Sequence, residues 1–180
     1  MKLSVVISSL WIDNEKPSIL HKCISSLSGH DELLALVTDF KTPLGFADSW
    51  NRVARLATGD YILFIGDNCV LDKGDLKDLC IENTVSSPVL NFQTQNFWGS
   101  VFCMPRNVYE QVGLYDMRYN EGSNYEDDDL RNRIEKIGYK FRSVVTVQFS
   151  KPSGGRTIDA NPDKELKKRR NAEIYKEIWS

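Results

Sequence analysis

Residues 54–68 read Ala-Arg-Leu-Ala-Thr-Gly-Asp-Tyr-Ile-Leu-Phe-Ile-Gly-Asp-Asn. This stretch contains the end of a helical pattern, a glycine that stops it at Gly59, and an apolar run at 61–65 that predicts a buried strand. The run ends in the polar residues 66–68. A helix followed closely by a buried strand with a polar end is typical of a parallel sheet covered by helices.

The chain before this stretch repeats the same pattern. Apolar, β-branched runs at 3–8 and 33–37 predict two more buried strands. Pro17 opens one helical pattern, and apolar residues recur at helical spacing over 46–57. The first third therefore alternates strand, helix, strand, helix, strand, and we predict an α/β protein.

Three polar segments follow the predicted strands, at 8–13, 39–42 and 66–72. Ligands of such sheets bind at the carboxyl ends of the strands, so we expect these segments to form the rim of a nucleotide site. Trp11 lies just past the first strand, where its ring could stack on a base or cap the core.

The rest of the chain is less regular. Strands are predicted at 89–92, 100–104 and 141–147, helices at 105–113, 126–137 and 164–178, and loops at 115–125 and 150–162. We expect the aromatic-rich segment 92–99 to contribute to the core or to face a sugar ring.

Length and composition limit the class of protein. The 180 residues fit one domain, and 41% hydrophobic with 27% charged residues is ordinary for a globular protein. A net charge of -2 argues against attraction of the whole surface to nucleic acid or anionic lipid. The sequence contains neither a signal-peptide pattern nor a run long enough for a membrane span. Four widely spaced cysteines are expected to be reduced, so we predict a cytoplasmic protein without an integral membrane part.

Residues 125–130 read Tyr-Glu-Asp-Asp-Asp-Leu. Four consecutive carboxylates repel one another, and the helix dipole offsets part of that cost at a helix start. One interpretation is an acidic, solvated first turn, and the other is that one carboxylate acts as a general base. Consecutive helical residues point about 100° apart, so one or two of the four can face a substrate.

The segment Glu-Asp-x-Asp-Leu-x-x-Arg at 126–133 resembles the ED motif of the family 2 inverting glycosyltransferases. Segments 3–9, 54–65, 112–116 (the family's V-G-G-F-D turn) and 170–175 resemble the same family in the same order. The resemblance implies the GT-A fold, a Rossmann-like mixed sheet flanked by helices. It also implies a single domain at 1–180, with a nucleotide-binding half at 1–72, an acceptor and catalytic half at 88–150, and a lid loop with a closing helix at 151–180.

The resemblance also implies roles for individual residues. Asp127 falls at the position of the catalytic base, with Glu126 beside it, and Asp39 at the position that accepts an N–H of the nucleotide base. Trp98 and Gly99 precede the strand that faces the acceptor. The residues expected to bind the donor are Ser8, Trp11, Asp39, Asn51, Asp67, Asn68, Lys151 and Arg156.

Asp67 and Asn68 fall at the metal-binding DxD motif, which is degenerate here. Gly66 stands in place of the first carboxylate, and an amide replaces the second. Divalent cations prefer hard oxygen ligands, so we expect Mn²⁺ or Mg²⁺ to be held weakly by Asp67 and Asn68. Lys151 and Arg156 belong to a glycine-bearing loop that is either a surface turn or a lid that shares the charge of the leaving group.

We therefore predict a glycosyltransferase that moves a sugar from a nucleotide diphosphate donor, with UDP-sugar favoured, to an acceptor hydroxyl with inversion. The alternatives are a catalytically lapsed nucleotide- or sugar-binding module and a nucleotidyltransferase of similar topology. The latter would need a glycine-rich phosphate loop, and segment 8–13 contains no glycine. The acceptor could be a glycan, a lipid-linked sugar, a protein or a modified DNA base. The basic run at 164–170 is a solvated face or a contact with an anionic acceptor.

Overall fold

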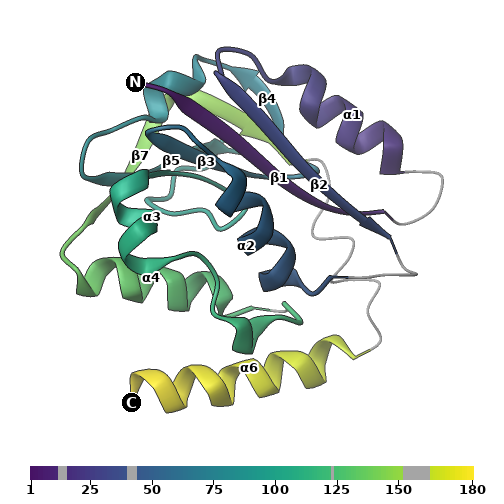
Figure 1. The fold of residues 1–180 in the computed structure, drawn as a ribbon, viewed down its shortest axis with the longest axis vertical. Coiled ribbons are helices and arrows are strands. Elements are labelled where there is room, and N and C mark those ends of the chain that lie inside the picture. The colour runs from purple at the N-terminus through teal and green to yellow at the C-terminus, as the bar shows by residue number, and fades with distance from the viewer. Residues whose placement is uncertain (12–15, 40–43, 123, 152–162) are drawn as a thin grey trace.

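The computed structural model describes residues 1–11, 16–39, 44–122, 124–151 and 163–180. A seven-stranded sheet with the order β2-β1-β3-β6-β5-β7-β4 lies at its centre (Figure 1). Its strands are β1 (Leu3–Trp11), β2 (Glu32–Asp39), β3 (Tyr61–Gly66), β4 (Val70–Lys73), β5 (Thr84–Leu90), β6 (Val101–Pro105) and β7 (Lys140–Ser150). The helices are α1 (Lys16–Ser26), α2 (Phe46–Leu56), α3 (Arg106–Val112), α4 (Glu126–Lys136) and α6 (Lys164–Trp179), with short 3₁₀ turns η1 (Leu76–Leu79) and η2 (Met117–Tyr119).

The sheet is mixed. β1 pairs in parallel with β2 and β3, which confirms the parallel part predicted from the alternating pattern. β6 runs antiparallel to both β3 and β5, and β7 lies parallel to β5 and antiparallel to β4. Ser8 of β1 is opposite Leu36 of β2 and Gly66 of β3, so the carboxyl ends of these three strands meet at one edge.

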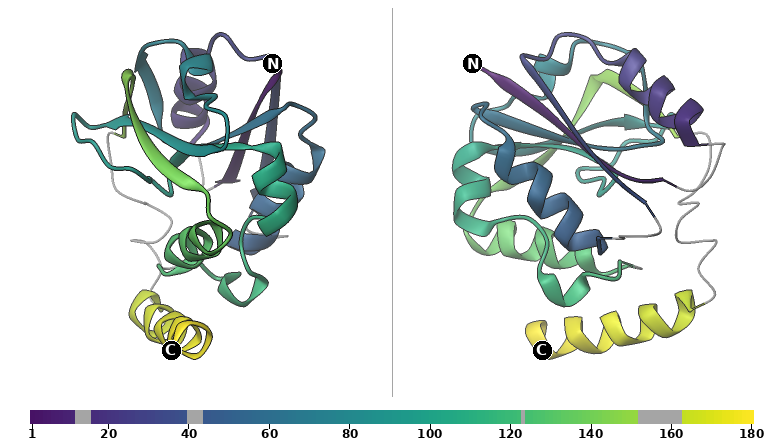
Figure 2. Two further views of the ribbon diagram at one scale, coloured as in Figure 1. Left: turned by 90° about the vertical axis from the view of Figure 1, so that its left-hand side faces the viewer. Right: turned by 45° about the vertical axis from the view of Figure 1, so that its right-hand side comes forward.

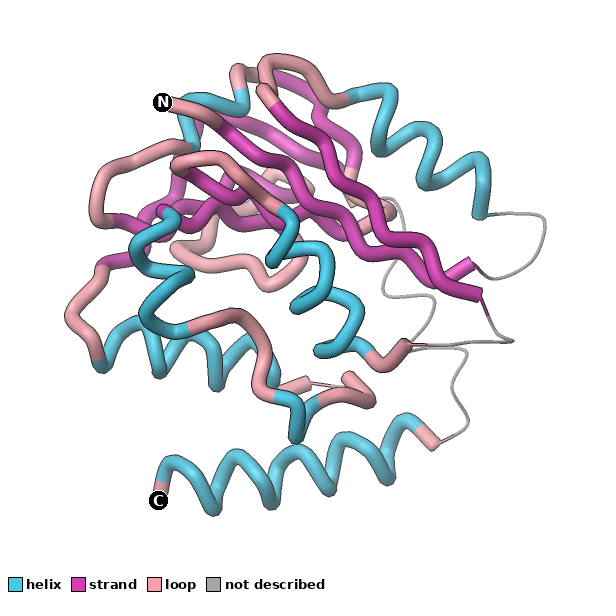
Figure 3. Tube along the Cα trace, viewed as in Figure 1, coloured by secondary structure: helices cyan, strands magenta, loops and turns pink. Residues whose placement is uncertain are grey.

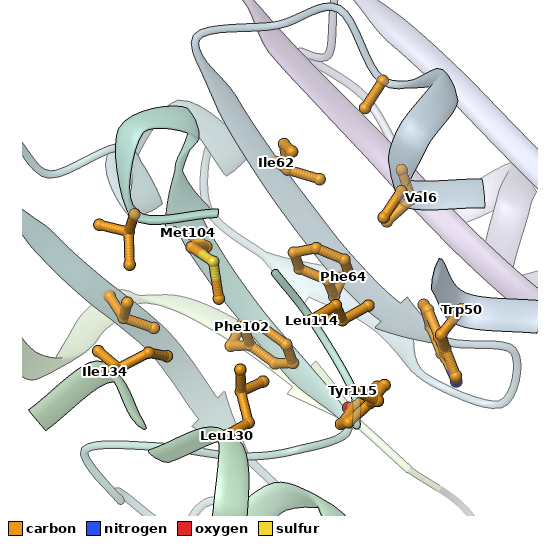
Figure 4. Close-up of a cluster of buried hydrophobic side chains, with 14 of the residues drawn as sticks. Val6, Trp50, Ile62, Phe64, Phe102, Met104, Leu114, Tyr115, Leu130 and Ile134 are labelled. Carbon is orange, nitrogen blue, oxygen red and sulfur yellow. The ribbon is translucent and has the colours of Figure 1, made fainter. Parts of the chain in front are cut away.

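Helices cover both faces of the sheet, and its central strands β1, β3, β6 and β5 are accordingly buried on both sides. Figure 2 and the trace in Figure 3 show α1 on one side of the strands and α2, α3 and α4 on the other. Side chains alternate along β1 accordingly. Val6 packs into the cluster under α2, α3 and α4 (Figure 4), whereas Val5 and Ile7 pack into the cluster under α1 and η1. Burial of these two apolar clusters is the main source of stability.

The middle of the sheet differs from the prediction. β5 lies at Thr84–Leu90, earlier than the expected 89–92, and β4 was not predicted. β5 contains Ser86, Ser87 and Pro88, which weaken a strand pattern, yet all three are buried. The Ser86 hydroxyl donates to the Leu79 carbonyl and so needs no water. Residues 92–99 form turns and loop, and Phe97 is the residue of this segment that is buried in the core.

α6 lies beside α4 and the turn that precedes it, at the bottom of Figure 1. Asn171, which is 2% exposed, donates from its side-chain amide to the carbonyls of Gly122 and Asn124, at 2.6 and 3.0 Å. The Asn132 amide donates to the Tyr175 hydroxyl at 2.6 Å. α6 therefore braces the start of α4. Across the described ranges, none of the helices combines the length and apolarity needed to cross a membrane.

Candidate active site

The four carboxylates at the start of α4 have different environments. Glu126 and Asp129 are 5% and 1% exposed, Asp127 is half-buried, and Asp128 is exposed. Tyr125, in the left-handed region with φ 72°, turns the chain into the helix just before them. The interpretation of a solvated acidic turn therefore describes Asp128 alone.

Asp129 has a structural role. Its Oδ2 accepts from Nε of Arg133 at 2.8 Å, and its Oδ1 accepts from the Trp179 indole at 3.0 Å. The Arg133 guanidinium also donates to the carbonyls of Val112 and Leu114. Both carboxylate oxygens are occupied, and the network joins α4 to α6 and to the turn after α3.

Asp127 lies directly against Gly99 and Tyr115. The Tyr115 hydroxyl donates to Asp127 Oδ1 at 3.1 Å. A Cβ added at Gly99 would lie 1.8 Å from Asp127 Oδ2, so the carboxylate occupies the space that a side chain at position 99 would need. Two residues predicted for the site, 28 positions apart in sequence, are thus in contact.

Burial raises the pKa of Asp127 to about 6. The hydrogen bond from Tyr115 opposes this increase, as does the positive charge of Lys151, and the negative charge of Asp128 adds to it. Asp127 is thus ionised for the most part at neutral pH, yet basic enough to accept a proton.

Glu126 points into the protein. Its Oε2 is buried and lacks a hydrogen-bond partner among the described residues. Burial, followed by the charge of Asp127, raises the pKa of Glu126 to about 7, against the backbone N–H groups of Asn124 and Glu126 itself. A carboxyl group with this pKa is partly protonated at neutral pH, which lowers the cost of burying it beside Asp127.

Lys151 lies at the start of the predicted lid loop. Its backbone N–H donates to the Asn91 side chain at 2.7 Å, and the Asn91 amide donates to the Lys151 carbonyl at 3.2 Å. Its charge lowers the pKa of both Asp127 and Cys69. Lys151 therefore lies near both the candidate base and the end of β3. Arg156 lies outside the described residues.

The rim of the sheet brings Asp67 to the end of β1. The Ser9 hydroxyl donates to Asp67 Oδ2 at 2.6 Å, whereas the Ser8 hydroxyl donates to Ser49 of α2 at 2.9 Å. Neighbouring residues of a strand face opposite sides, so Ser8 faces the α2 side and Ser9 faces Asp67. The sequence prediction named Ser8 and not Ser9, because alternation alone does not tell which face of β1 holds Asp67.

Trp11 and Asp39 are register partners at the ends of β1 and β2. Their backbones are therefore adjacent at the expected rim, while their side chains lie outside the described part of the structure. Their roles in nucleotide binding stay predictions.

Asn51 has a bracing role. Its side-chain amide donates to the Tyr115 carbonyl at 2.8 Å, and the Tyr115 N–H donates to its Oδ1 at 3.0 Å. It lines a pocket of about 370 Å³ between α2 and α3, together with Arg55, Tyr109 and Arg133. Its amide is thus occupied by the backbone of Tyr115, which gives it a structural function that the sequence prediction did not include.

Trp98 packs against the cluster under α1 and η1, and its indole N–H is buried without a partner among the described residues. Its backbone N–H donates to Ser87 at 3.0 Å. This bond fixes the loop that carries Gly99 to β5. The backbone of Trp98 therefore helps to place Gly99 against Asp127. The role of Trp98 in acceptor binding stays a prediction.

The residues predicted to hold a metal are Asp67 and Asn68. Asn68 offers an amide oxygen, which lies 3.8 Å from the Cys69 sulfur. Within the described ranges, no three His, Cys, Asp or Glu side chains gather in a way that could hold an ion. One carboxylate and one amide oxygen suit an ion such as Mg²⁺ that is held largely by substrate phosphates.

No protein-family model matches the sequence, and no curated protein matches it. Solved structures do match. GalNAc-T7 with UDP, GalNAc and Mn²⁺ superposes with a TM-score of 0.68 and 13% identity, over 97% of this chain and 50% of that chain. TarS 1–349 from S. aureus with UDP-GlcNAc gives 0.66 and 14%, over 96% and 66%. The mannosyltransferase PcManGT from Pyrobaculum calidifontis with GDP-Man and Mn²⁺ gives 0.62 and 14%, over 86% and 58%.

These neighbours are GT-A glycosyltransferases, and the chain has the GT-A fold: a curled mixed sheet with helices on both faces. It spans half the length of the GalNAc-T7 chain. Identities of 13–14% show the fold alone.

Proposed function

We propose that the chain is a glycosyltransferase that moves a sugar from a nucleotide diphosphate donor to an acceptor hydroxyl. The observation that carries the proposal is the Asp127 carboxylate, which is half-buried at the start of α4, held by Tyr115, and in contact with Gly99. The neighbours of this fold were solved with UDP, UDP-GlcNAc and GDP-Man, which supports a nucleotide-sugar donor.

In the proposed reaction, Asp127 takes the proton of the acceptor hydroxyl as that oxygen attacks the anomeric carbon of the sugar. A bond forms between the acceptor oxygen and this carbon, and the bond from the carbon to the donor phosphate breaks. The nucleoside diphosphate departs from the opposite face, so the configuration inverts. A base with a pKa of about 6 suits this step because proton acceptance and ionisation are balanced near neutral pH.

The donor would bind at the carboxyl ends of β1, β2 and β3, where Asp67 and Ser9 meet. Asp39 favours a uracil base in this proposal, although neighbours of the fold were solved with either UDP or GDP-Man. Mn²⁺ or Mg²⁺, held by Asp67, Asn68 and the donor phosphates, would offset the charge of the leaving diphosphate. Lys151 and Arg156 would share that charge from the lid side.

A second candidate is a nucleotide-sugar-binding module that has lost catalysis. The observation that favours it is the degenerate motif at the end of β3, where one carboxylate and one amide stand in place of two carboxylates. Such a module would bind the donor and would leave it intact in the presence of any acceptor.

The experiment compares Asp127→Asn with the wild-type protein. A panel of UDP- and GDP-sugars is first screened for thermal stabilisation and nucleotide diphosphate release, and the active pair is then used for kinetics. Asp127→Asn should lower turnover by about 10²–10⁴-fold and leave donor affinity unchanged, because the base acts on the acceptor. Asp128→Asn is the matched control, since this neighbouring carboxylate is exposed and should be silent.

Glu126→Gln tests whether the buried neighbour holds the role instead. Full turnover in all three amide variants of an active protein would refute the assignment of the base. Donor binding without transfer to any acceptor would favour the binding module.

A further inference from the structure

Tyr115 is a buried side chain whose only polar atom reaches the candidate base. It is 5% exposed, and its hydroxyl donates to Asp127 Oδ1 at 3.1 Å. A buried hydroxyl without a partner would be costly, and Asp127 supplies that partner.

Tyr115 is held rigidly. The Asn51 side chain makes hydrogen bonds to both its carbonyl and its N–H, at 2.8 and 3.0 Å. Its ring packs against Phe46 with a centroid distance of 4.9 Å. Figure 4 shows it between Leu130 and Trp50 at the edge of the apolar cluster. The backbone and ring of Tyr115 are therefore held against α2.

The two oxygens of Asp127 are not equivalent. Oδ1 accepts from Tyr115, whereas Oδ2 lies over Gly99 and has no hydrogen bond to the described residues. Gly99 belongs to the segment that precedes β6, on the side where the acceptor is expected. Oδ2 is thus the oxygen of Asp127 that the described hydrogen bonds leave without a donor.

We propose that Tyr115 is a positioning residue for the reaction: its buried hydroxyl occupies Oδ1 of Asp127 and leaves Oδ2 to take the proton of the acceptor. The inference rests on the proposed function. It assigns Tyr115 no contact with substrate. A hydrogen bond to a carboxylate favours the ionised form, so the same contact keeps Asp127 able to accept a proton.

The charged groups around Asp127 and Tyr115 both raise and lower the pKa values of these two side chains. Lys151, at the end of β7, favours the ionised form of Asp127, and Asp128 on α4 opposes it. Burial and the charges of Asp127 and Glu126 raise the pKa of the Tyr115 hydroxyl well above its usual range, while Arg133 lowers it. The hydroxyl therefore stays protonated, and remains a donor, at neutral pH.

The test is Tyr115→Phe, with Tyr119→Phe as the matched control. Tyr119 is fully buried, and its hydroxyl has no partner among the described residues, so its loss changes no bond to Asp127. In Tyr115→Phe the pKa of Asp127 should rise from about 6 to about 7 or above. The acid limb of kcat/KM should move by the same amount, so that kcat/KM falls about fivefold at pH 6 and recovers for the most part at pH 8.5.

The pKa of Asp127 is measured separately, by carboxyl carbon NMR titration without any substrate, assigned with Asp127→Asn. An unchanged Asp127 titration in Tyr115→Phe would overturn the positioning role, even in an active enzyme. A shifted titration in a protein that transfers no sugar would uphold the contact and refute the proposed function. Equal shifts in Tyr115→Phe and Tyr119→Phe would also overturn the inference, because they would reflect a general effect of core changes.

A measurement on the wild-type protein covers the case in which Tyr115→Phe does not fold. The Tyr115 hydroxyl proton should exchange slowly with water, and its NMR resonance should move between pH 5 and 7 as Asp127 titrates. A resonance that is insensitive to pH over this range would overturn the inference.

Discussion

Gly99→Ala should displace the proposed base, Asp127, while leaving its carboxylate chemically intact. The added Cβ would lie 1.8 Å from Asp127 Oδ2 and 2.0 Å from its Cγ, whereas ordinary contacts begin at 3.4 Å. Gly99 is absent from the glycines with positive φ, so alanine brings no backbone strain and acts only through this overlap. Either the carboxylate or the 98–100 loop must therefore retreat by about 1.6 Å.

A misplacement of about 1 Å can cost roughly 10²-fold in rate, so turnover of Gly99→Ala should fall by about that factor or more. Overpacking of this kind costs about 1–3 kcal/mol of stability, and each kcal/mol lowers Tm by roughly 2–4 °C in a chain of this size. Donor affinity should be unchanged. The assay compares kcat, the donor Kd and Tm for wild type and variant, at a temperature where both are folded.

A double-mutant cycle with Asp127→Asn identifies the cause. If Gly99→Ala acts by displacing the base, it should cost little further activity once the base is an amide. Losses that multiply would show that Gly99 acts through another group. A Gly99→Ala protein with turnover within about threefold of wild type would refute the reasoning, because the carboxylate would then have room to move without consequence.

Three further outcomes are expected. Asp129→Ala removes a buried carboxylate that accepts hydrogen bonds from Arg133 and Trp179. The free energy of unfolding, measured with denaturant, should fall by about 3 kcal/mol, and a decrease below about 1 kcal/mol would mean that the Asp129–Arg133 pair is effectively solvated. Glu126 and Asp127 have pKa values raised to about 7 and about 6, so the folded chain binds more protons than the unfolded chain between roughly pH 4 and 7. Their contribution to stability is present below pH 4 and is lost as pH rises through 6 and 7. Between pH 5 and 8, Tm of the double variant Glu126→Gln, Asp127→Asn should therefore fall less than Tm of wild type. Parallel curves of Tm against pH for the two proteins would contradict this. Chelation should lower turnover, and added Mn²⁺ or Mg²⁺ should restore it. Calorimetry without donor should show weak metal binding, because the described end of β3 offers one carboxylate, Asp67. A Kd for the metal below about 1 µM in the absence of donor would contradict the metal assignment.

The amino-acid sequence was sufficient for the order of elements in the first third of the chain. β1, β2 and β3 are continuous apolar runs ended by polar residues, and α2 and α4 have apolar residues at helical spacing. These are local patterns of period and termination, and they need no knowledge of what packs where. The GT-A fold was expected for a different reason, the resemblance of five segments, in the same order, to the family 2 glycosyltransferases.

Where local pattern and burial disagree, the prediction was wrong or incomplete. β5 includes a proline and two serines, and β4 is four residues long with two charged side chains, so neither resembles a strand in sequence. Both are strands because neighbours on the sheet supply their backbone partners. Pairing of this kind is a property of the assembled sheet.

The four consecutive carboxylates at 126–129 predict a general base by residue type alone, and it was the family resemblance that pointed to Asp127 among them. Packing separates them: Asp128 faces solvent, Asp129 is bound on both oxygens, Glu126 is buried, and Asp127 lies against Gly99. Its contacts come from residues 12 and 28 positions away, and no period in the sequence encodes a distance between two separate loops. Sequence periodicity determines which face of an element is buried. Only the tertiary packing of α4 against the loops before α4 and β6 determines that Asp127 is the carboxylate with one oxygen held by Tyr115 and the other against Gly99.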